Sequence, residues 1–108
     1  MKEAIKKSEV LIEALPYIRK FFEKTIANAK ALYSVGLVHA DLSEFNILNF
    51  EEEPVFIDFS QATTLEHPQV HEYLKRDLTN ICKYFRKQGV KADEEAIHAE
   101  ILRSFPKH

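Results

Sequence analysis

The sequence predicts an α+β fold that is mostly helical and carries one small β-hairpin. Two observations lead to this class. Apolar residues recur every three or four positions in the first and last thirds of the chain, which is typical of helices with one buried face. In the middle third, two short apolar runs with β-branched and aromatic residues flank an acidic turn, which favours paired strands. A length of 108 residues without a visible repeat or linker suits a single domain over 1–108.

The leading segment, residues 1–36, is predicted to form two helices. Proline fits the first turn of a helix better than its interior, so Pro16 divides the segment into a weak helix over 2–14 and a strong helix over 16–34. Gly36 then suits the left-handed residue that ends the second helix. One apolar stripe runs along this segment, formed by Leu11, Leu15, Ile18, Phe22, Ile26, Ala29 and Leu32.

The central segment, residues 37–60, is predicted to form the hairpin. Residues 47–50 are expected to pair with 55–58, and the acidic turn E-E-E-P between them forms a solvated tip to which we assign no metal. In this arrangement the polar loop over 39–46 lies beside the strand end at Asp58.

The closing segment, residues 61–108, returns to helix. Pro68 suits the entry turn of a helix that Gly89 closes, and Asp93 is a good N-cap for a final helix. The spacing predicts a buried side for each helix, formed by Leu74, Leu78, Ile81 and Phe85 in the first and by Ile97, Ile101 and Phe105 in the second.

Composition excludes several functional classes. Gly36 and Gly89 are the two glycines and lie far apart, so the chain has no glycine-rich phosphate loop of the Walker or protein-kinase type. A net charge of −2 without a basic stripe gives no direct signal for nucleic acid. No apolar run reaches the ~20 residues that span a bilayer, so we expect no membrane partner. Cys82 is the single cysteine and cannot form an internal disulfide, which favours a reducing, cytoplasmic location.

Four polar residues of the central segment form a pattern with chemical meaning: His39, Asp41, Asn46 and Asp58, in the strings H-A-D-L-S-E-F-N and I-D-F-S. An Asp in a loop before a strand can accept a proton from an attacking hydroxyl, and an Asn five residues later can turn its amide oxygen to Mg²⁺. An Asp at the end of a buried strand can bind the same ion through its carboxylate. His39 is expected to brace the loop from behind.

These strings resemble the protein-kinase superfamily, and most closely the first branch of the RIO family of atypical serine/threonine kinases. Four separated motifs agree with that family in order and spacing. They are L-V-H-A-D-L-S-E-F-N-I-L at 37–48, I-D-F-S-Q at 57–61, H-P at 67–68 and L-K-R-D at 74–77.

The resemblance implies ATP- and Mg²⁺-dependent phosphoryl transfer by a kinase or ATPase. It implies that Asp41 is catalytic and that Asn46 and Asp58 are metal ligands, and the family also suggests that Asp58 accepts phosphate as an aspartyl-phosphate. The family acts in maturation of the small ribosomal subunit, which implies a pre-ribosomal partner. For Asp77 two alternatives stay open: it forms a solvated pair with Arg76, or it points inward and binds the backbone of the catalytic loop.

The resemblance also implies a fold, the C-terminal lobe of a protein kinase, whose hairpin carries the catalytic and metal-binding loops. A kinase further needs an N-terminal lobe with a glycine-rich loop, a strand lysine and a helix glutamate. Lys20 and Lys24 lie on the exposed side of a predicted helix and cannot replace that lysine. We therefore expect a C-lobe without an N-lobe that is nearly inactive alone, because positioning and charge neutralisation supply most of the catalysis.

Two departures from ordinary kinases agree with the RIO family. Ala40 precedes Asp41 where other kinases place an arginine that pairs with a phosphorylated activation loop. The stretch between Asp58 and the next helix is also too short for a long activation loop. Both departures argue against a conventional peptide substrate.

Two other functions stay open. A small-molecule phosphotransferase of the aminoglycoside or choline kinase type shares the H-x-D, Asn and later I-D elements, but such enzymes usually carry a Gly after the His and lack the Ser-Gln and His-Pro elements. A non-catalytic binding module would dock on a partner or self-associate through an apolar face that an N-lobe would cover, along helix 16–34 or beside Ile47 and Phe59.

Overall fold

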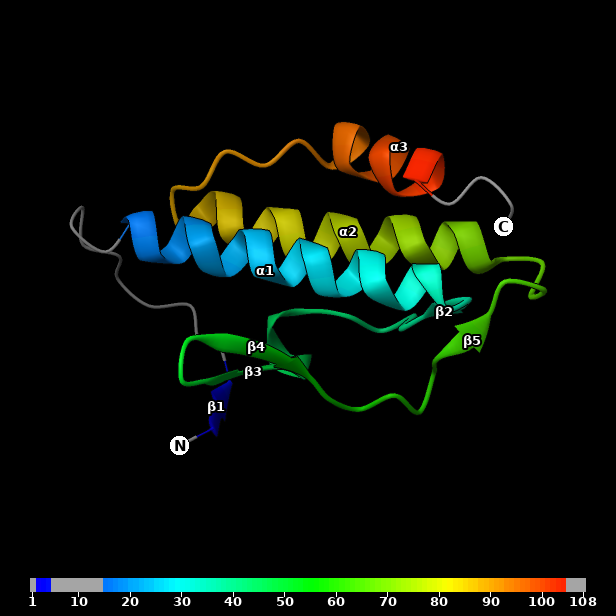
Figure 1. Ribbon diagram of the computed structural model, residues 1–108, viewed down its shortest axis with the longest axis horizontal. Coiled ribbons are helices and arrows are strands. Elements are labelled where there is room, and N and C mark those ends of the chain that lie inside the picture. Colours follow the sequence, from blue (N-terminus) through cyan, green and yellow to red (C-terminus); the bar gives the residue numbers. More distant parts are fainter. Residues whose placement is uncertain (1, 5–14, 105–108) are drawn as a thin grey trace.

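The computed structural model describes residues 2–4 and 15–104 of the chain. Two long helices, α1 (Leu15–Ser34) and α2 (Val70–Lys87), run side by side, and α3 (Glu94–Ser104) packs against α2 (Figure 1). The strands lie on the other side of the helix pair, in two small antiparallel sheets (Figure 1). This arrangement confirms the predicted α+β class, mostly helical with a small hairpin.

The remaining elements are five short strands and one 3₁₀ helix within the described residues. One sheet has the order β1-β3-β4, and the other pairs β2 with β5. A short 3₁₀ helix, η2, precedes β3. The bounds are Lys2–Ala4 for β1, Leu37–Val38 for β2, Glu44–Asn46 for η2, Ile47–Phe50 for β3, Glu53–Phe56 for β4 and Thr63–Thr64 for β5. Within the described ranges, no helix is both long and apolar enough to cross a bilayer.

The first long helix forms where the apolar spacing predicts it. It begins one residue before Pro16, which therefore occupies the first turn. The Gly36 amide donates to the carbonyl of Tyr33 at 2.9 Å with φ +86°, so the predicted left-handed ending is confirmed. The fully buried residues of the helix are Phe21, Phe22, Thr25, Ala29 and Tyr33. The predicted stripe is therefore correct for Phe22 and Ala29, whereas Leu15, Ile18, Ile26 and Leu32 are only partly buried.

The predicted weak helix over 2–14 is wrong at its beginning. Residues 2–4 form the strand β1, which pairs antiparallel with β3 so that Lys2 lies opposite Phe50 and Ala4 opposite Leu48. Without β1, strand β3 would be a sheet edge with unpaired N–H and C=O groups, and pairing these groups outweighs weak helical periodicity. Residues 5–14 lie outside the described ranges.

The hairpin forms with a register different from the predicted one. Ile47 pairs with Phe56 and Phe50 pairs with Glu53, so β4 spans 53–56 instead of 55–58. The turn contains only Glu51 and Glu52, whose φ angles of +50° and +68° are those of a two-residue turn that matches the twist of the strands. This tighter turn moves the pairing by two residues and leaves Asp58 beyond the strand.

Helix α2 begins and ends, and helix α3 begins, close to the predicted positions; Phe105, predicted on the buried side of the final helix, lies outside the described residues. Helix α2 begins at Val70, after a turn in which the Val70 amide donates to the carbonyl of His67 at 3.1 Å. Gly89, with φ +95°, follows its end. The Asp93 carboxylate accepts from the Ala96 amide at 3.0 Å and caps α3 as predicted.

The core holds residues from the central segment as well as from the helices. Leu42, inside the polar loop over 39–46, and Ile47, the first residue after it, are 1% and 0% exposed and belong to the same buried cluster as Phe22 and Phe85 of the long helices. The predicted α2 stripe, which includes Leu78, is buried throughout. The polar loop is therefore anchored by the buried residues His39, Ala40 and Leu42, and it exposes Asp41 and Phe45 to solvent.

Candidate catalytic and metal-binding site

Helix α2 holds the candidate catalytic loop, which is the polar loop over 39–46, through one buried carboxylate. Asp77 is 3% exposed, and its two oxygens accept from the backbone amides of Ala40 at 2.8 Å and Leu42 at 2.9 Å. Of the two alternatives considered for Asp77, the structure therefore has the inward one, in which the carboxylate binds the loop backbone. Burial raises the pKa of Asp77, while the two amide donors and the charges of His39 and Arg76 act in the opposite direction.

Two neighbours of Asp77 complete this attachment; in the sequence, Arg76 was considered only as a solvated partner of Asp77, and Asn80 was missed. Arg76 donates to the carbonyl of Ala40, and the Asn80 side chain donates to the carbonyl of Leu42 at 3.2 Å. Polar residues at positions 76, 77 and 80 share one side of a helix whose other side is apolar, so this spacing was the available signal. The side chains of Arg76, Asp77 and Asn80 thus bind both the amide and the carbonyl groups of Ala40 and Leu42.

The loop backbone at Ala40 is left-handed, with φ +73°. Such a conformation costs a residue with a Cβ atom roughly 1–2 kcal/mol. The bonds from Asp77 and Arg76 to this residue and to Leu42 offset that cost, because they bind the backbone on both sides of the bend. As a result Asp41, the next residue, is exposed while its neighbours on both sides are buried.

His39 connects the catalytic loop to the segment after β4. Its Nε2 lies 2.8 Å from the carbonyl oxygen of Ile57, and its Nδ1 accepts from the Asp41 amide at 3.2 Å. In the neutral ring this places the proton on Nε2, which donates to Ile57. The ring also packs against that of Phe59, with 4.8 Å between centroids. Since both nitrogens are engaged, His39 positions the loop and has no nitrogen left for a metal.

Asn46 and Asp58 come from adjoining stretches of backbone. The Ile57 amide donates to the carbonyl of Asn46 at 2.9 Å, and Asp58 is the next residue. The Asn46 amide nitrogen donates to the carbonyl of Asp41 at 2.7 Å, which turns its amide oxygen away from the loop. One Asp58 oxygen accepts from the Ser60 hydroxyl at 2.9 Å, and the carboxylate is exposed at a left-handed residue with φ +61°.

The donor set fits a magnesium ion better than a structural metal. An amide oxygen and a carboxylate are hard ligands, and Mg²⁺ takes its other ligands from water and phosphates. In the part of the chain that the structure describes, no group of three or more His, Cys, Asp or Glu side chains could hold a metal ion. The residues present therefore suit an ion that arrives with phosphates and is held by few side chains.

Comparison with known protein families establishes the family to which this chain belongs. The sequence pattern of the RIO domain matches residues 3–97. The chain belongs to the RIO family. This match includes the leading helix, the catalytic loop, the hairpin and α2, so it covers every element that builds the site.

Several curated RIO proteins are similar to this chain. It is 46% identical over 83 residues to the RIO-type serine/threonine-protein kinase Rio1 of Methanocaldococcus jannaschii, a match that covers 76% of this chain and 29% of the relative. It is 38% identical over 95 residues to Rio1 of Haloferax volcanii, covering 84% and 30%, and 42% identical over 84 residues to Rio2 of M. jannaschii, covering 77% and 31%. The chain thus spans less than a third of the length of these relatives.

A solved structure supports the fold assignment. The Rio2 kinase–ADP/Mg²⁺–phosphoaspartate complex from Chaetomium thermophilum superposes with a TM-score of 0.69 at 26% identity, over 86% of this chain and 31% of that one. The predicted kinase-like fold is therefore confirmed.

Proposed function

We propose that this chain is the C-terminal lobe of a RIO-type serine/threonine kinase or ATPase and supplies the catalytic and metal-binding half of its site. The observation that supports the proposal is that the backbone of Ile57 forms two hydrogen bonds with the loop. Its amide binds the carbonyl of Asn46 and its carbonyl binds His39, which joins the loop bearing Asp41 to the segment bearing Asp58. The named kinases among the relatives support this assignment over a small-molecule phosphotransferase.

Each side chain in the proposed site has one task. Asp41 is exposed at the bend of the loop and accepts the proton of the attacking hydroxyl. The Asn46 amide oxygen and the Asp58 carboxylate hold Mg²⁺, which neutralises phosphate charge when it is bound. His39 and Asp77 position the loop and do not touch the substrate. The free energy for this positioning comes from the fold and does not depend on the nucleotide.

Asp58 has a second proposed role as phosphate acceptor. An Asp58 carboxylate oxygen attacks the γ-phosphorus of ATP, the new O–P bond forms as the bond to the β–γ bridging oxygen breaks, and ADP leaves with the electron pair. Water then hydrolyses the acyl phosphate and restores the carboxylate with release of phosphate. The phosphoaspartate named for the C. thermophilum Rio2 complex and the exposed, left-handed Asp58 support this role.

The proposed lobe lacks the parts that hold the remaining phosphates. Its two glycines cannot form a phosphate loop, and Lys24 binds Glu53 at 2.6 Å at the hairpin tip. Lys20 is exposed on α1. We therefore expect the 108-residue chain alone to be nearly inactive towards ATP and to need an N-lobe.

A segment exchange tests the proposed function. The matching segment of M. jannaschii Rio1 is replaced by this chain, and the hybrid is incubated with γ-³²P-ATP and Mg²⁺. We expect hydroxylamine-labile labelling that is lost in Asp58→Asn and ATP turnover that is lost in Asp41→Asn, whereas Asp93→Asn, on the surface at the start of α3, retains both. An inactive but folded hybrid, or persistent labelling of Asp58→Asn, would contradict the proposal.

Metal binding is testable in this chain without turnover. Mn²⁺, used as a paramagnetic substitute for Mg²⁺, should broaden the amide signals of 41–46 and 57–60 in the wild type and less so in Asn46→Ala or Asp58→Asn. Equal broadening in all three proteins would refute the assignment of these ligands.

The second candidate function is a binding module, and an apolar hollow on the surface favours it. Ala31, Leu32, Phe56 and Phe59 line a shallow depression of about 300 Å³, and Phe59 is 45% exposed. Under this alternative the chain self-associates through that face. Sedimentation of the wild type and Phe59→Ser decides it: a concentration-dependent dimer that the substitution dissolves supports the module, and a monomer at all concentrations refutes it.

The family resemblance extends the proposal to a cellular role. We place the protein in the cytoplasm with a pre-ribosomal small-subunit particle as partner. Sucrose-gradient fractionation of cells that express a tagged chain should show it with small-subunit precursors, and its recovery only at the top of the gradient would contradict this role.

A further inference from the structure

A cavity of about 240 Å³ lies between α2 and α3, away from the catalytic loop. At 100° per residue, Lys75, Leu78 and Thr79 occupy one side of α2, while Arg76, Asp77 and Asn80, which bind the loop, occupy another. The volume lies just below the ~300 Å³ at which sites for drug-sized ligands begin. It therefore suits a molecule the size of a single amino acid. The cavity is lined by Lys75, Leu78, Thr79, Glu94, Glu95, His98, Ala99 and Leu102.

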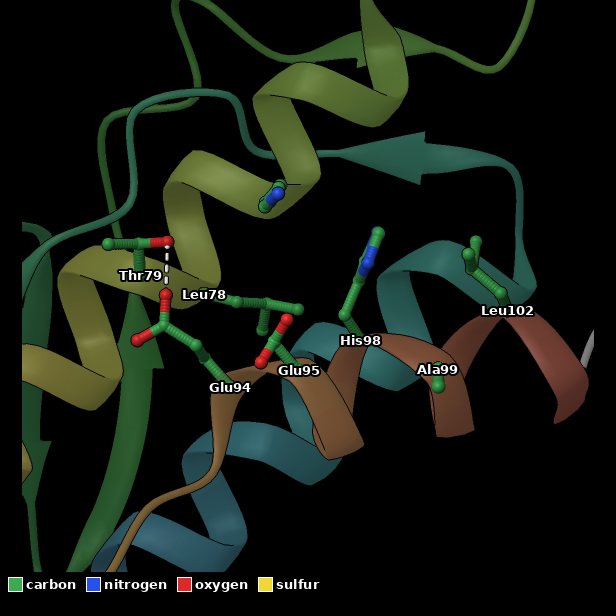
Figure 2. Close-up of a pocket in the computed structure, with 8 residues that line it drawn as sticks. Leu78, Thr79, Glu94, Glu95, His98, Ala99 and Leu102 are labelled. Atoms are coloured by element: carbon green, nitrogen blue, oxygen red, sulfur yellow. Dashed lines mark hydrogen bonds between the residues drawn. The ribbon is translucent and has the colours of Figure 1, made fainter.

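The imidazole of His98 has an unfilled hydrogen-bonding capacity. Its Nε2 is buried and has no hydrogen-bond partner. Burial, and to a smaller extent the electrostatic effect of Lys75 and His71, lowers the pKa of His98 and so favours the neutral ring. Figure 2 shows His98 projecting from α3 towards α2 beside Leu78. His98 is also one of the residues that line the cavity, so the unpartnered imidazole lies at its wall.

Two charged groups at the cavity are also available. Neither the Lys75 ammonium nor the Glu95 carboxylate forms an ion pair or hydrogen bond with the residues that the structure describes. Glu94 differs, because it accepts from the Thr79 hydroxyl at 2.7 Å (Figure 2) and from Arg86 at 2.9 Å. Lys75 and Glu95 are both exposed to solvent, and Lys75 also interacts electrostatically with Glu94. The cavity thus offers one cation and one anion on its exposed side, together with one imidazole.

We propose that this cavity binds a small zwitterion of the α-amino-acid class with an aliphatic side chain. Its carboxylate accepts from Lys75 and from a His98 ring N–H, and its ammonium group donates to Glu95. Its side chain packs against Leu78 and Leu102. Neither a simple anion nor a simple cation would satisfy both charges, whereas a zwitterion pairs each of them. The proposal is independent of the phosphoryl-transfer function.

The test is an NMR titration of the full ¹⁵N-labelled chain with three probes of similar shape. L-leucine carries both charges, 4-methylpentanoate only the carboxylate, and 3-methylbutylamine only the ammonium group. We expect L-leucine to shift the His98 ring resonances saturably and the two analogues to bind at least about tenfold more weakly, since a charge-assisted hydrogen bond contributes that much.

Variants assign the contacts. Lys75→Met and Glu95→Gln should each weaken L-leucine binding about tenfold, whereas Lys83→Met, which removes a charge from another side of α2, should not. The two variants test the site separately, so a folding defect in one leaves the other informative. The proposal is overturned if L-leucine produces no saturable shift at His98, if either analogue binds as tightly as L-leucine, or if Lys83→Met weakens binding as much as Lys75→Met.

Discussion

Replacing Asp77 should destabilise the protein through the candidate catalytic loop over 39–46. Asp77→Ala leaves the buried amides of Ala40 and Leu42 without acceptors, and each such group costs about 1–3 kcal/mol, so the expected loss is about 2–6 kcal/mol. Asp77→Asn retains one acceptor oxygen and removes a buried charge, which reduces the loss to about 1–3 kcal/mol. A chain of 108 residues has only about 5–16 kcal/mol of stability, so Asp77→Ala should be close to unfolding.

Urea unfolding followed by far-UV circular dichroism measures this loss, and amide hydrogen exchange locates it. In Asp77→Asn, exchange at Ala40 and Leu42 should accelerate more than exchange at buried amides elsewhere in α2. Asp93→Asn is the matched control, because Asn caps a helix as well as Asp does and position 93 is exposed. An Asp77→Asn protein within about 0.5 kcal/mol of the wild type, with both loop amides still protected, would refute the reasoning.

Four further predictions follow from the fold. Burial raises the pKa of Cys82 to about 11, so iodoacetamide at pH 8 should label it only in urea; rapid labelling of the folded protein would contradict this. Phe85→Ala should cost about 3–5 kcal/mol in urea unfolding, because the ring is 2% exposed in an aromatic core, and a loss below about 1 kcal/mol would count against that packing. The lowered pKa of His98 means that the unfolded chain binds more protons below about pH 6.5, so stability should fall on acidification and fall less in His98→Gln; equal losses would contradict the burial of this ring. Replacing Glu51 and Glu52 together by Asn and Gly should raise the unfolding free energy by about 1 kcal/mol, since both have positive φ, and a decrease would show that the turn conformation is wrong.

The sequence predicted the parts of the fold that depend on local periodicity. The spacing of Leu74, Leu78 and Phe85 predicted α2, and Pro16 and Gly36 predicted the ends of α1 within one or two residues. The loop of Asp41 and Asn46 was also expected to lie beside Asp58, because hairpin pairing brings those positions together. These features follow from residues close in the chain, which is why one sequence was enough.

The features that the sequence did not predict arise from contacts distant in the chain. Strand β1 exists because β3 offers it an edge more than forty residues away, and three residues carry too little periodicity to reveal this. The hairpin register depends on two glutamates adopting positive φ, which their residue type disfavours. The cavity at His98 depends on how α3 rests on α2, and helical periodicity does not specify that distance.

The attachment of the catalytic loop to α2 bears on how the site could be transplanted. A graft of residues 39–46 alone onto another scaffold would lose the acceptors for Ala40 and Leu42 and relax out of the left-handed bend. The smallest portable unit is the loop together with the turn of α2 that carries Arg76, Asp77 and Asn80. A design that transplants this loop must therefore include this turn of α2 as well.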